Sequence, residues 1–414
     1  MKKISLSLAA IAMIATVAQA EIKSESFGGS ASLFYGTNDA GNGDLFNKGT
    51  SYGNTAINLG GVASVGSCDT CTKLNYGLTG VSTMGLQHTL VSNTWVDQEY
   101  TTNSGGGLKI DDAIWIDTLN LTFTPLDGIS NTTLVVGRQA LATPMAFTET
   151  WNIAKNTFDA IVAVNGDIEK TTLVGAWVAR SNGFGVLGTT SPSSAGADGT
   201  VRARNISGGF ERFLTDEGAY AFGAVTELIP AVTAQAWYYI APSTTNVAWL
   251  QAETEYAGFS LGGQFGMLDA RDNSDGNAMA VKLGYSYEGL GLGVAYSQVE
   301  ALTGTAAAVG FKNLAGLQSS LYTEAWWNYG VVGESDTDTV SASATYGIAD
   351  IADLGLFLTL ADNGTTNKTM QEIAVTASKS IENLDVTLAY INADFDEAGV
   401  DAQNDIQAYF TYNF

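Results

Sequence analysis

The last ten residues of the chain, 405–414, place the strongest constraint on its fold. Aromatic and apolar side chains occupy every second position and polar side chains stand between them, a pattern that predicts a β-strand with two different faces. At the open edge of a soluble sheet such a strand would favour aggregation. In a transmembrane β-barrel it meets lipid and water on opposite faces, and its edge pairs with the first strand. The expected lipid face contains Ile406, Ala408, Phe410, Tyr412 and Phe414.

The first twenty residues have the pattern of a secretory signal peptide. Lys2 and Lys3 precede an apolar run over residues 4–17, and Ala18, Gln19 and Ala20 supply a small-x-small cleavage site. An uncleaved anchor helix is the alternative, but the run is shorter than the ~20 residues that span a membrane. We therefore expect residues 1–20 to be removed and residues 21–414 to form one folded domain.

Beyond residue 20 the composition favours strands over spanning helices. No apolar run approaches ~20 residues, so a membrane-embedded chain would have to cross the bilayer as a β-barrel. Charged residues make up 14% of the chain, whereas soluble domains average about 25%. The 47 glycines and only 5 prolines also suit strands that are wet on one face and lipid-covered on the other.

The chain is strongly acidic. Its formal net charge is −24, and it becomes −26 when Lys2 and Lys3 leave with the signal peptide. This balance argues against nucleic acid as a partner, because phosphate binding needs clustered cations. It is compatible with a surface or pore that attracts cations. The alternative is that the acidic residues only keep exposed loops soluble.

Two cysteines, Cys68 and Cys71, stand in the sequence Cys-Asp-Thr-Cys. An exported chain meets an oxidising compartment, so a local disulfide that closes a turn is the favoured interpretation. A thioredoxin-like redox role lacks the expected strand–helix context. A zinc site is disfavoured because His88 is the only histidine and four ligands cannot be assembled.

Alternating segments recur along the whole chain and predict an all-β, antiparallel transmembrane barrel. In residues 277–287, for example, the side chains of Met279, Val281 and Leu283 share one face. Counting back from the last strand gives eight short periplasmic turns and nine outer loops, hence about 18 strands, with a range of about 16–20. The range reflects the strand-like stretches 201–211 and 318–329, which we assign to loops, and no plug domain or extension is expected. The turns fall near 67–72, 125–130, 166–169, 227–230, 257–258, 287–290, 347–353 and 381–383, and the loops at 38–53, 85–112, 140–157, 181–217, 242–245, 269–276, 300–336, 362–369 and 393–403.

The third outer loop, residues 140–157, is the candidate constriction. Pro144 cannot continue a central strand, so the chain must turn there. The loop also carries Met145, Phe147, Trp151 and Ile153, which would pack better against the inner wall than extend into water. Folded inward, it would present the pore-lining side chains of Glu149, Asn152 and Lys155. The alternative is an external loop that caps a neighbour.

Three segments resemble a known family. Residues 134–144 and 156–164 are similar to the third-strand-pair region of OprD-type porins and the campylobacterial major outer membrane protein, and residues 321–330 resemble their seventh-loop pattern. The resemblance implies an eighteen-stranded barrel, usually trimeric, with an inward third loop and diffusion of small hydrophilic solutes. Some members line the channel with a dense arginine ladder, whereas this chain has only six arginines.

Five of the six arginines lie between residues 138 and 212. A basic arc that faced acidic loops would create a transverse field across the pore and set its charge preference. Arg138 has the parity of Leu134 and Val136, which a simple alternation turns toward lipid, so this hypothesis needs a bulge there. Alternatively, the arginines stand at loop bases and pair with carboxylates or lipopolysaccharide phosphates. The candidate pore arginines are Arg138 and Arg180, and the wider arc adds Arg202, Arg204 and Arg212.

Wall carboxylates are better placed to line a pore. In residues 247–256 the apolar positions fall on one face, so Glu253 and Glu255 should point inward, and Asp385 does so by the same parity. A charge facing lipid near the bilayer centre would cost about 2–4 kcal/mol for a cation and less for a carboxylate. These side chains favour a lumen that prefers cations.

No cofactor or catalytic centre is expected. The final loop is acidic and calcium binding there is possible, but the regular spacing of an EF-hand is absent. Catalysis lacks support because His88 is the only histidine and no Gly-x-Ser-x-Gly elbow is near it. The residues considered at this loop are Asn392 and the carboxylates of Asp394, Asp396, Glu397 and Asp401.

These features together predict a porin of a Gram-negative outer membrane. A barrel of about 18 strands leaves an aqueous lumen, whereas about 8 strands would be filled by side chains. The expected function is passive diffusion of ions and small hydrophilic solutes, with lipid and lipopolysaccharide around a homotrimer. The alternative is a structural or adhesin barrel, in which Trp326 and Trp327 would form a surface patch instead of folding the seventh loop onto the barrel mouth.

Overall fold

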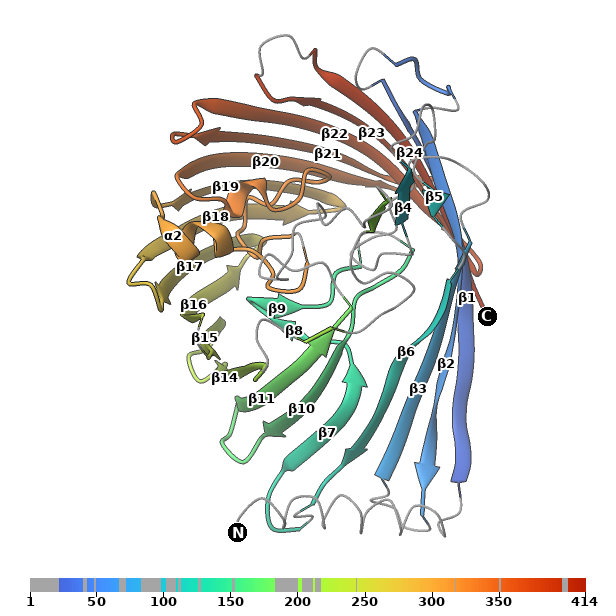
Figure 1. Cartoon of the computed structure of the whole chain (residues 1–414), viewed down its shortest axis with the longest axis vertical. Helices are drawn as coiled ribbons and strands as arrows, with labels where there is room; N and C mark the ends of the chain where they lie inside the picture. Colours follow the sequence, from blue (N-terminus) through green and yellow to red (C-terminus); the bar gives the residue numbers. More distant parts are fainter. Residues whose placement is uncertain are drawn as a thin grey trace.

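Eighteen antiparallel strands close into one barrel (Figure 1). The last strand, β24 (Gln403–Asn413), pairs with β1 (Ile22–Asn38) from Asn38↔Asp405 to Ser30↔Asn413, which closes the ring. The sheet has 19 segments, but β13 and β14 both pair with β11 and form one strand of the barrel. The structure is a computed structural model that describes residues 22–39, 43–47, 50–66, 72–82, 98–101, 109–110, 113–125, 128–150, 153–182, 200–202, 211–212, 217–242, 244–316, 318–349, 351–396 and 401–414.

The strand ends confirm the predicted turns and loops. The other barrel strands are β2 (Ser51–Val65), β3 (Thr72–Ser82), β6 (Ala113–Phe123), β7 (Thr132–Gln139), β10 (Phe158–Asn165), β11 (Thr171–Ser181), β13 (Glu211–Arg212), β14 (Ala219–Thr226), β15 (Val232–Ala241), β16 (Thr245–Tyr256), β17 (Phe259–Ala270), β18 (Asp275–Tyr287), β19 (Leu290–Val299), β20 (Thr337–Ile348), β21 (Ala352–Asn363), β22 (Lys368–Ile381) and β23 (Leu384–Asp394). The predicted count of 18 strands is therefore confirmed. Residues 318–329, which left the count open, contain no strand and belong to the seventh outer loop.

Short turns join the strands at one end of the barrel. The turns Ala257–Gly258 and Glu288–Gly289 have only two residues, and φ is positive at both positions in each, at 51° and 83° and at 44° and 84°. Such turns match the right-handed twist of the flanking strands. Because the turns are tight, they fix the register of each hairpin and hence which side chains face outward.

The outer face of the barrel is apolar, as the alternation predicts. On β18, Met279, Val281 and Leu283 are 46%, 55% and 51% exposed, whereas the intervening Ala278 and Ala280 are buried. Soluble proteins rarely expose contiguous apolar surface on this scale. Aromatic residues collect beside the short turns, as in the interfacial girdle of a membrane barrel. These include Phe27, Tyr256, Phe259, Tyr287, Tyr346, Tyr412 and Phe414.

The remaining elements lie in the outer loops. Two segments of the third loop, β8 (Ala142–Thr143) and β9 (Ala146–Phe147), pair with each other and lie within the ring of strands in Figure 1. The seventh loop contains the helix α2 (Gly304–Val309) and the 3-10 turn η3 (Val331–Gly333). A separate small sheet joins β4 (Gln98–Thr101), β5 (Lys109–Ile110) and β12 (Thr200–Arg202). Within the described ranges, no helix has the length and apolarity needed to cross a membrane.

Candidate pore constriction

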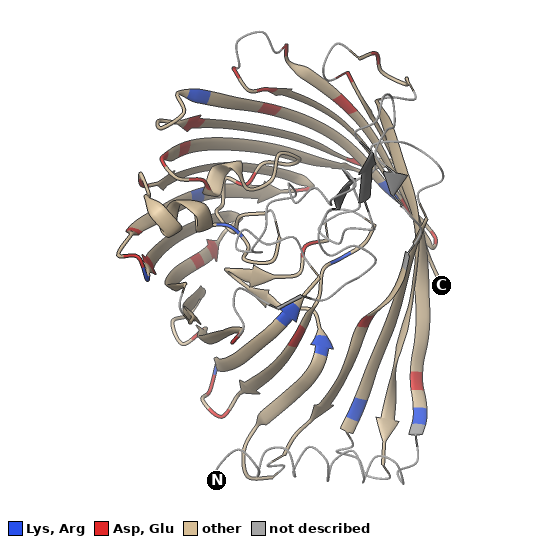
Figure 2. Cartoon of the chain, in the orientation of Figure 1, with Lys and Arg blue, Asp and Glu red and all other residues tan. Residues whose placement is uncertain are grey.

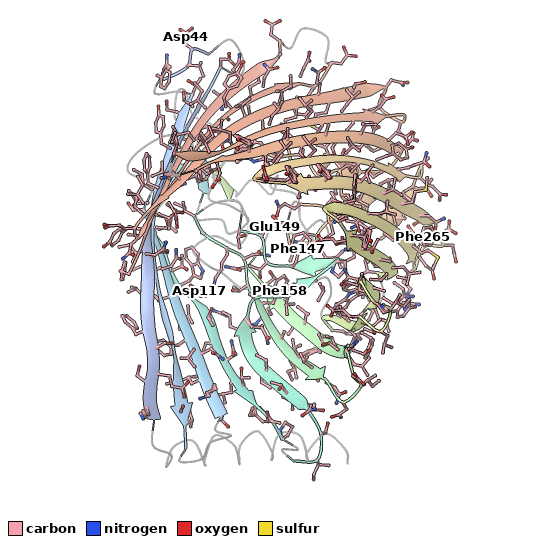
Figure 3. All side chains as sticks on the ribbon, turned by 180° about the vertical axis from the view of Figure 1, so that it is seen from behind. Asp44, Asp117, Phe147, Glu149, Phe158 and Phe265 are labelled. Carbon is pink, nitrogen blue, oxygen red and sulfur yellow. The ribbon has the colours of Figure 1, made fainter. Side chains whose placement is uncertain are left out.

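The third outer loop (residues 140–157, hereafter loop 3) contacts wall residues on two sides of the barrel. The backbone N–H of Met145 donates to the Tyr239 hydroxyl at 3.2 Å, and the Asn58 amide donates to the Ile153 carbonyl at 3.5 Å. Tyr239 is 3% exposed while its neighbour Tyr238 is 45% exposed, so Tyr239 is on the inner face of β15. Figure 3 shows Phe147 and Glu149 of this loop within the ring of strands, whereas Phe265 lies on the outside.

Loop 3 is joined to the seventh outer loop (residues 300–336, hereafter loop 7) by a buried polar cluster. The Asn313 amide donates to the Glu149 carboxylate at 2.7 Å, and the backbone N–H of Gln318 donates to the same carboxylate at 2.8 Å. Asn313 also accepts from the backbone N–H of Phe147 at 3.2 Å. Glu149 is only 1% exposed. Its carboxylate therefore binds loop 7 and does not face open lumen, which differs from the exposed role expected from the sequence.

Loop 7 is held to the opposite wall by one carboxylate, Glu372 of β22. It accepts hydrogen bonds from the backbone N–H groups of Trp326, Trp327 and Asn328 at 2.7, 3.0 and 2.8 Å. The Asn328 side chain donates a fourth bond at 2.6 Å. Glu372 is 1% exposed and shares its face with the fully buried Ala374. A buried carboxylate is tolerated because these donors replace its lost hydration.

Tyr322 of loop 7 contacts a second polar cluster on the barrel wall, formed by Glu253 and Lys282. The Glu253 carboxylate accepts from the Tyr322 hydroxyl and from Lys282, each at 2.8 Å. The ammonium group of Lys282 also lies 4.3 Å from the centre of the Tyr322 ring, a favourable cation–π distance. Gly262 makes room for this contact, since a Cβ there would lie 2.7 Å from the Tyr322 hydroxyl. The wall has a glycine where loop 7 packs closely.

Loops 3 and 7 border a cavity of about 830 Å³ whose wall is rich in hydroxyl groups. Glu324 of loop 7 is among its lining residues, and its carboxylate accepts backbone N–H bonds from Gly330 at 2.9 Å, from Ala325 at 3.1 Å and from Ser319. Burial raises the pKa of Glu324 to about 8, although these N–H donors act in the opposite direction. The lining also includes Ser30, Ser32, Asn58, Tyr322, Trp326, Ser341, Ser343, Thr359, Thr387, Tyr409 and Thr411.

The predicted wall carboxylates have the inward orientation expected from alternation. Leu250 and Tyr256 of β16 are 50% and 82% exposed on the outside, so Glu253 and Glu255 are on the inner face. Leu388 of β23 is exposed on the outer face, and Asp385, three positions earlier, has the opposite parity and therefore faces inward. The Asp385 carboxylate accepts a hydrogen bond from the Asn413 side chain at 2.9 Å. Of the predicted loop 3 residues, Lys155 is partly buried and Asn152 lies outside the described residues.

The structure contradicts the prediction that Arg138 and Arg180 face the lumen. Arg138 is the register partner of Leu119 on one side and Asp159 on the other. Leu119 is 48% exposed on the outer face, so this row of residues is turned away from the lumen. Asp159 is in turn the partner of Arg180. Arg138 therefore faces away from the lumen by simple alternation, which no register shift of β7 reverses. Arg180 has the parity of the buried Val178, but the register with β10 shifts between Asp159 and Ala160, and this irregularity turns Arg180 to the outside beside Asp159.

Other predicted sites fall largely outside the described residues. Cys68, Cys71 and Arg204 are not among them, and neither is Glu397 of the acidic final loop. Arg202 and Arg212 are described by backbone alone: Arg202 pairs in register with Glu99, and Arg212 with Arg180. In the part of the chain that the structure describes, no three potential metal ligands gather in one place.

The geometry defines a class of protein: a closed transmembrane barrel of the outer-membrane type, with long loops at one end, short turns at the other and a polar lumen. Solved structures with this architecture include OccK8 (OprE) of Pseudomonas aeruginosa, at 13% identity and a TM-score of 0.66 over 94% of this chain and 98% of that one. OpdK of the same organism, with vanillate, gives 11% and 0.69 over 95% and 99%. OccAB4 of Acinetobacter baumannii gives 12% and 0.65 over 94% and 99%. At these identities the likeness establishes the fold.

Comparison by sequence adds no closer assignment. No protein-family model matches the chain, and no curated protein matches it.

Proposed function

We propose that the protein is an outer-membrane porin, a channel for passive diffusion of ions and small hydrophilic solutes. The observation that carries the proposal is the polar cavity of about 830 Å³ inside a closed barrel whose outer face is apolar. A barrel this wide is not filled by its own wall side chains. The likeness to OccK8 and OpdK over nearly their whole lengths supports the same reading of the fold.

The proposal includes an inward-folded third loop that narrows the lumen together with loop 7. It is supported by the hydrogen bonds of Met145 to Tyr239 and of Glu149 to Asn313. Large barrels need such a constriction to select among solutes. The sequence pattern indicates loop 3 but gives no sign of loop 7 as part of the constriction, because loop 7 is attached to side chains far away in the chain.

A cation preference is the finer part of the proposal. Two lysines, Lys73 and Lys282, are each ion-paired, with Glu25 and Glu253. Along the inner face, carboxylates outnumber these two lysines. A lumen with a net negative charge concentrates cations. Such a channel would differ in preference from one that holds a carboxylate such as vanillate, which is present in the OpdK structure. The inward carboxylates are Asp117, Glu253, Glu255, Glu372, Asp385 and Asp405.

Planar-bilayer recording of the purified, folded protein across a salt gradient tests the proposal. Discrete conductance steps are expected, with a reversal potential that indicates cation preference. Anion preference would overturn the cation assignment and leave the channel intact. If the folded barrel gave no conductance steps, the channel function would be wrong, and the alternative of a structural or adhesin barrel would be favoured.

Opposite substitutions in one ion pair should shift the selectivity in opposite directions. Glu253→Gln leaves the Lys282 charge uncompensated, and Lys282→Gln leaves the Glu253 charge uncompensated. Unit charges about 4 Å apart in water interact by about 1 kcal/mol and less when screened, so we expect changes of about twofold in the cation/anion permeability ratio. The ratio should fall in the first variant and rise in the second. Equal reversal potentials in both variants would show that this pair does not face the permeation path.

The cation preference should also depend on pH. Burial raises the pKa of Glu324 to about 8, so its side chain is mostly neutral at pH 7 and mostly charged at pH 9. The permeability ratio for cations should therefore rise between these two values in the wild type. Reversal potentials of Glu324→Gln, recorded over the same range, should lack this step. A step of the same size in the variant would assign the titration to another group.

We retain a homotrimer, surrounded by lipid and lipopolysaccharide, as the expected assembly. This part rests on the resemblance noted in the sequence. Light scattering of the detergent-solubilised protein, corrected for bound detergent, should give three times the mass of one chain. A single-chain mass would overturn the trimer without affecting the channel.

A further inference from the structure

The outward-facing arginines form an ion-paired cluster across three adjacent strands. Arg138 of β7 donates through Nε to the Asp159 carboxylate of β10 at 2.8 Å, and Arg180 of β11 reaches the same carboxylate at 2.6 Å. Arg138 also donates to the Ile116 carbonyl at 2.7 Å. One carboxylate is shared by two guanidinium groups, so the cluster carries a net positive charge. Figure 2 shows blue at the tips of β7 and β11, with red on β10 between them.

The two arginines differ in what they can still bind. The side chains of Arg138 and Asp159 are only 19% and 17% exposed, whereas that of Arg180 is 51% exposed. Arg138 and Asp159 therefore form a fixed base, and Arg180 presents its guanidinium group to the surroundings. A guanidinium group can bind a phosphate through two parallel hydrogen bonds.

The cluster stands at the boundary between headgroups and hydrocarbon. Arg138 is the last residue but one of β7, and Asp159 is the second residue of β10, both next to an outer loop. One step toward the opposite end of the barrel, Ile161 and Trp177 are register partners and are 39% and 37% exposed on the same outer face. Tryptophan is enriched at such membrane interfaces. A lipid with its phosphate at Arg180 would place its acyl chains along this apolar row.

Elsewhere the described outer rim carries pairs of exposed carboxylates. Asp338 of β20 is the register partner of Asp362 of β21, and both are exposed near the outer loops. Asp269 and Asp275 form a second such pair across β17 and β18. These carboxylate pairs would repel an anionic headgroup, whereas the arginine cluster would attract it.

We propose that the cluster of Arg138, Asp159 and Arg180 binds a phosphate group of an outer-leaflet glycolipid on the outside of the barrel through its guanidinium groups. Arg180 makes the direct contact, and Asp159 holds the two arginines in place on adjacent strands. The site lies outside the lumen and is separate from the permeation path. It fixes this side of the barrel, formed by β7, β10 and β11, against the lipid of the outer leaflet.

Native mass spectrometry of the full-length folded protein in detergent tests the site. The probes are lipid A with both phosphates, its monophosphoryl form, and inorganic phosphate. The wild type should retain the bisphosphorylated lipid, and Arg180→Gln should retain at least fivefold less. Arg180→Lys should recover part of the binding, because it restores the charge without the bidentate geometry. The matched control is Arg271→Gln, which changes an exposed arginine in the outer loop that joins β17 and β18 and should bind as the wild type does.

Each of the other outcomes would overturn the proposal. Equal lipid retention by wild type and Arg180→Gln, or equal loss in Arg271→Gln, would show that the cluster is not the site. Displacement of the lipid by inorganic phosphate at equimolar phosphate would identify a free-anion site instead of a lipid site. Because Arg180 is half exposed and Asp159 keeps its ion pair with Arg138 in the variants, heat-modifiable gel mobility should show that they fold as the wild type does.

Discussion

Replacing Glu372 by alanine is expected to release loop 7 from the wall and to raise the single-channel conductance. Its carboxylate accepts four hydrogen bonds from residues 326–328. Hydrogen bonds to a charged group contribute about 1.5–3 kcal/mol each, so their joint loss is large for a single loop. We expect the mean conductance to rise by about twofold and to fluctuate more, because a detached loop no longer narrows the lumen steadily. Single-channel recording measures both quantities.

A carboxylate on the adjacent strand provides the control. Asp362 of β21 is exposed on the outer face and accepts from the Thr369 hydroxyl at 3.1 Å, so Asp362→Ala should leave the conductance unchanged. Cleavage by trypsin at Lys312 of loop 7 should accelerate in Glu372→Ala alone. If Glu372→Ala folds and conducts as the wild type does, the attachment of loop 7 to this wall does not set the pore size.

Deleting residues 145–155 and joining the ends with a short glycine–serine linker is expected to give the largest effect. The deletion removes Met145, Phe147 and Glu149, and with them the contacts to Tyr239 and to Asn313 of loop 7. Both loops would then lose their mutual support. We expect a conductance increase larger than that of Glu372→Ala, and faster entry of larger sugars in liposome-swelling assays.

Shortening an outer loop that does not reach the lumen controls for the deletion. Residues 364–366 lie in the short connection from β21 to β22. The Thr366 backbone N–H donates to Asn363, and the Thr365 hydroxyl donates to Asp336 at the end of loop 7, next to β20. Removal of residues 364–366 should leave conductance and sugar entry unchanged. Unchanged conductance in the 145–155 deletion, from a barrel that still folds, would mean that loop 3 does not line the permeation path.

Much of the barrel could be predicted because its determinants are local. Alternation at period two identifies the lipid face of each strand, and Leu250 and Tyr256 are exposed where that pattern places them. Tight turns such as Ala257–Gly258 then fix the strand boundaries. The same parity correctly assigned Glu253 and Glu255 to the inner face. The same parity predicts that Arg138 faces outward. The register of Arg138 with the exposed Leu119 confirms this parity and contradicts the pore-lining hypothesis for Arg138.

The proposed constriction could be predicted only in part. The apolar residues and Pro144 marked loop 3 as unsuited to water, but nothing local indicates a partner for Glu149. Its hydrogen-bond partner Asn313 is 164 residues away in the chain. Glu372 has inward parity, yet a sequence alone does not show that it accepts the N–H groups of Trp326 and Trp327. The tryptophans fold loop 7 to the wall through their backbone, which no pattern of side chains encodes.

The sequence by itself determined the barrel, its approximate strand count and the outward or inward direction of most of its wall residues. It could do so because lipid on one side and water on the other impose a repeat that every strand satisfies independently. Only the tertiary structure decided that loops 3 and 7 bind each other, that Glu372 anchors one of them, and that Arg138 and Arg180 share Asp159 on the outside. These contacts join residues distant in the chain, and their geometry exists only after the ring of strands has closed.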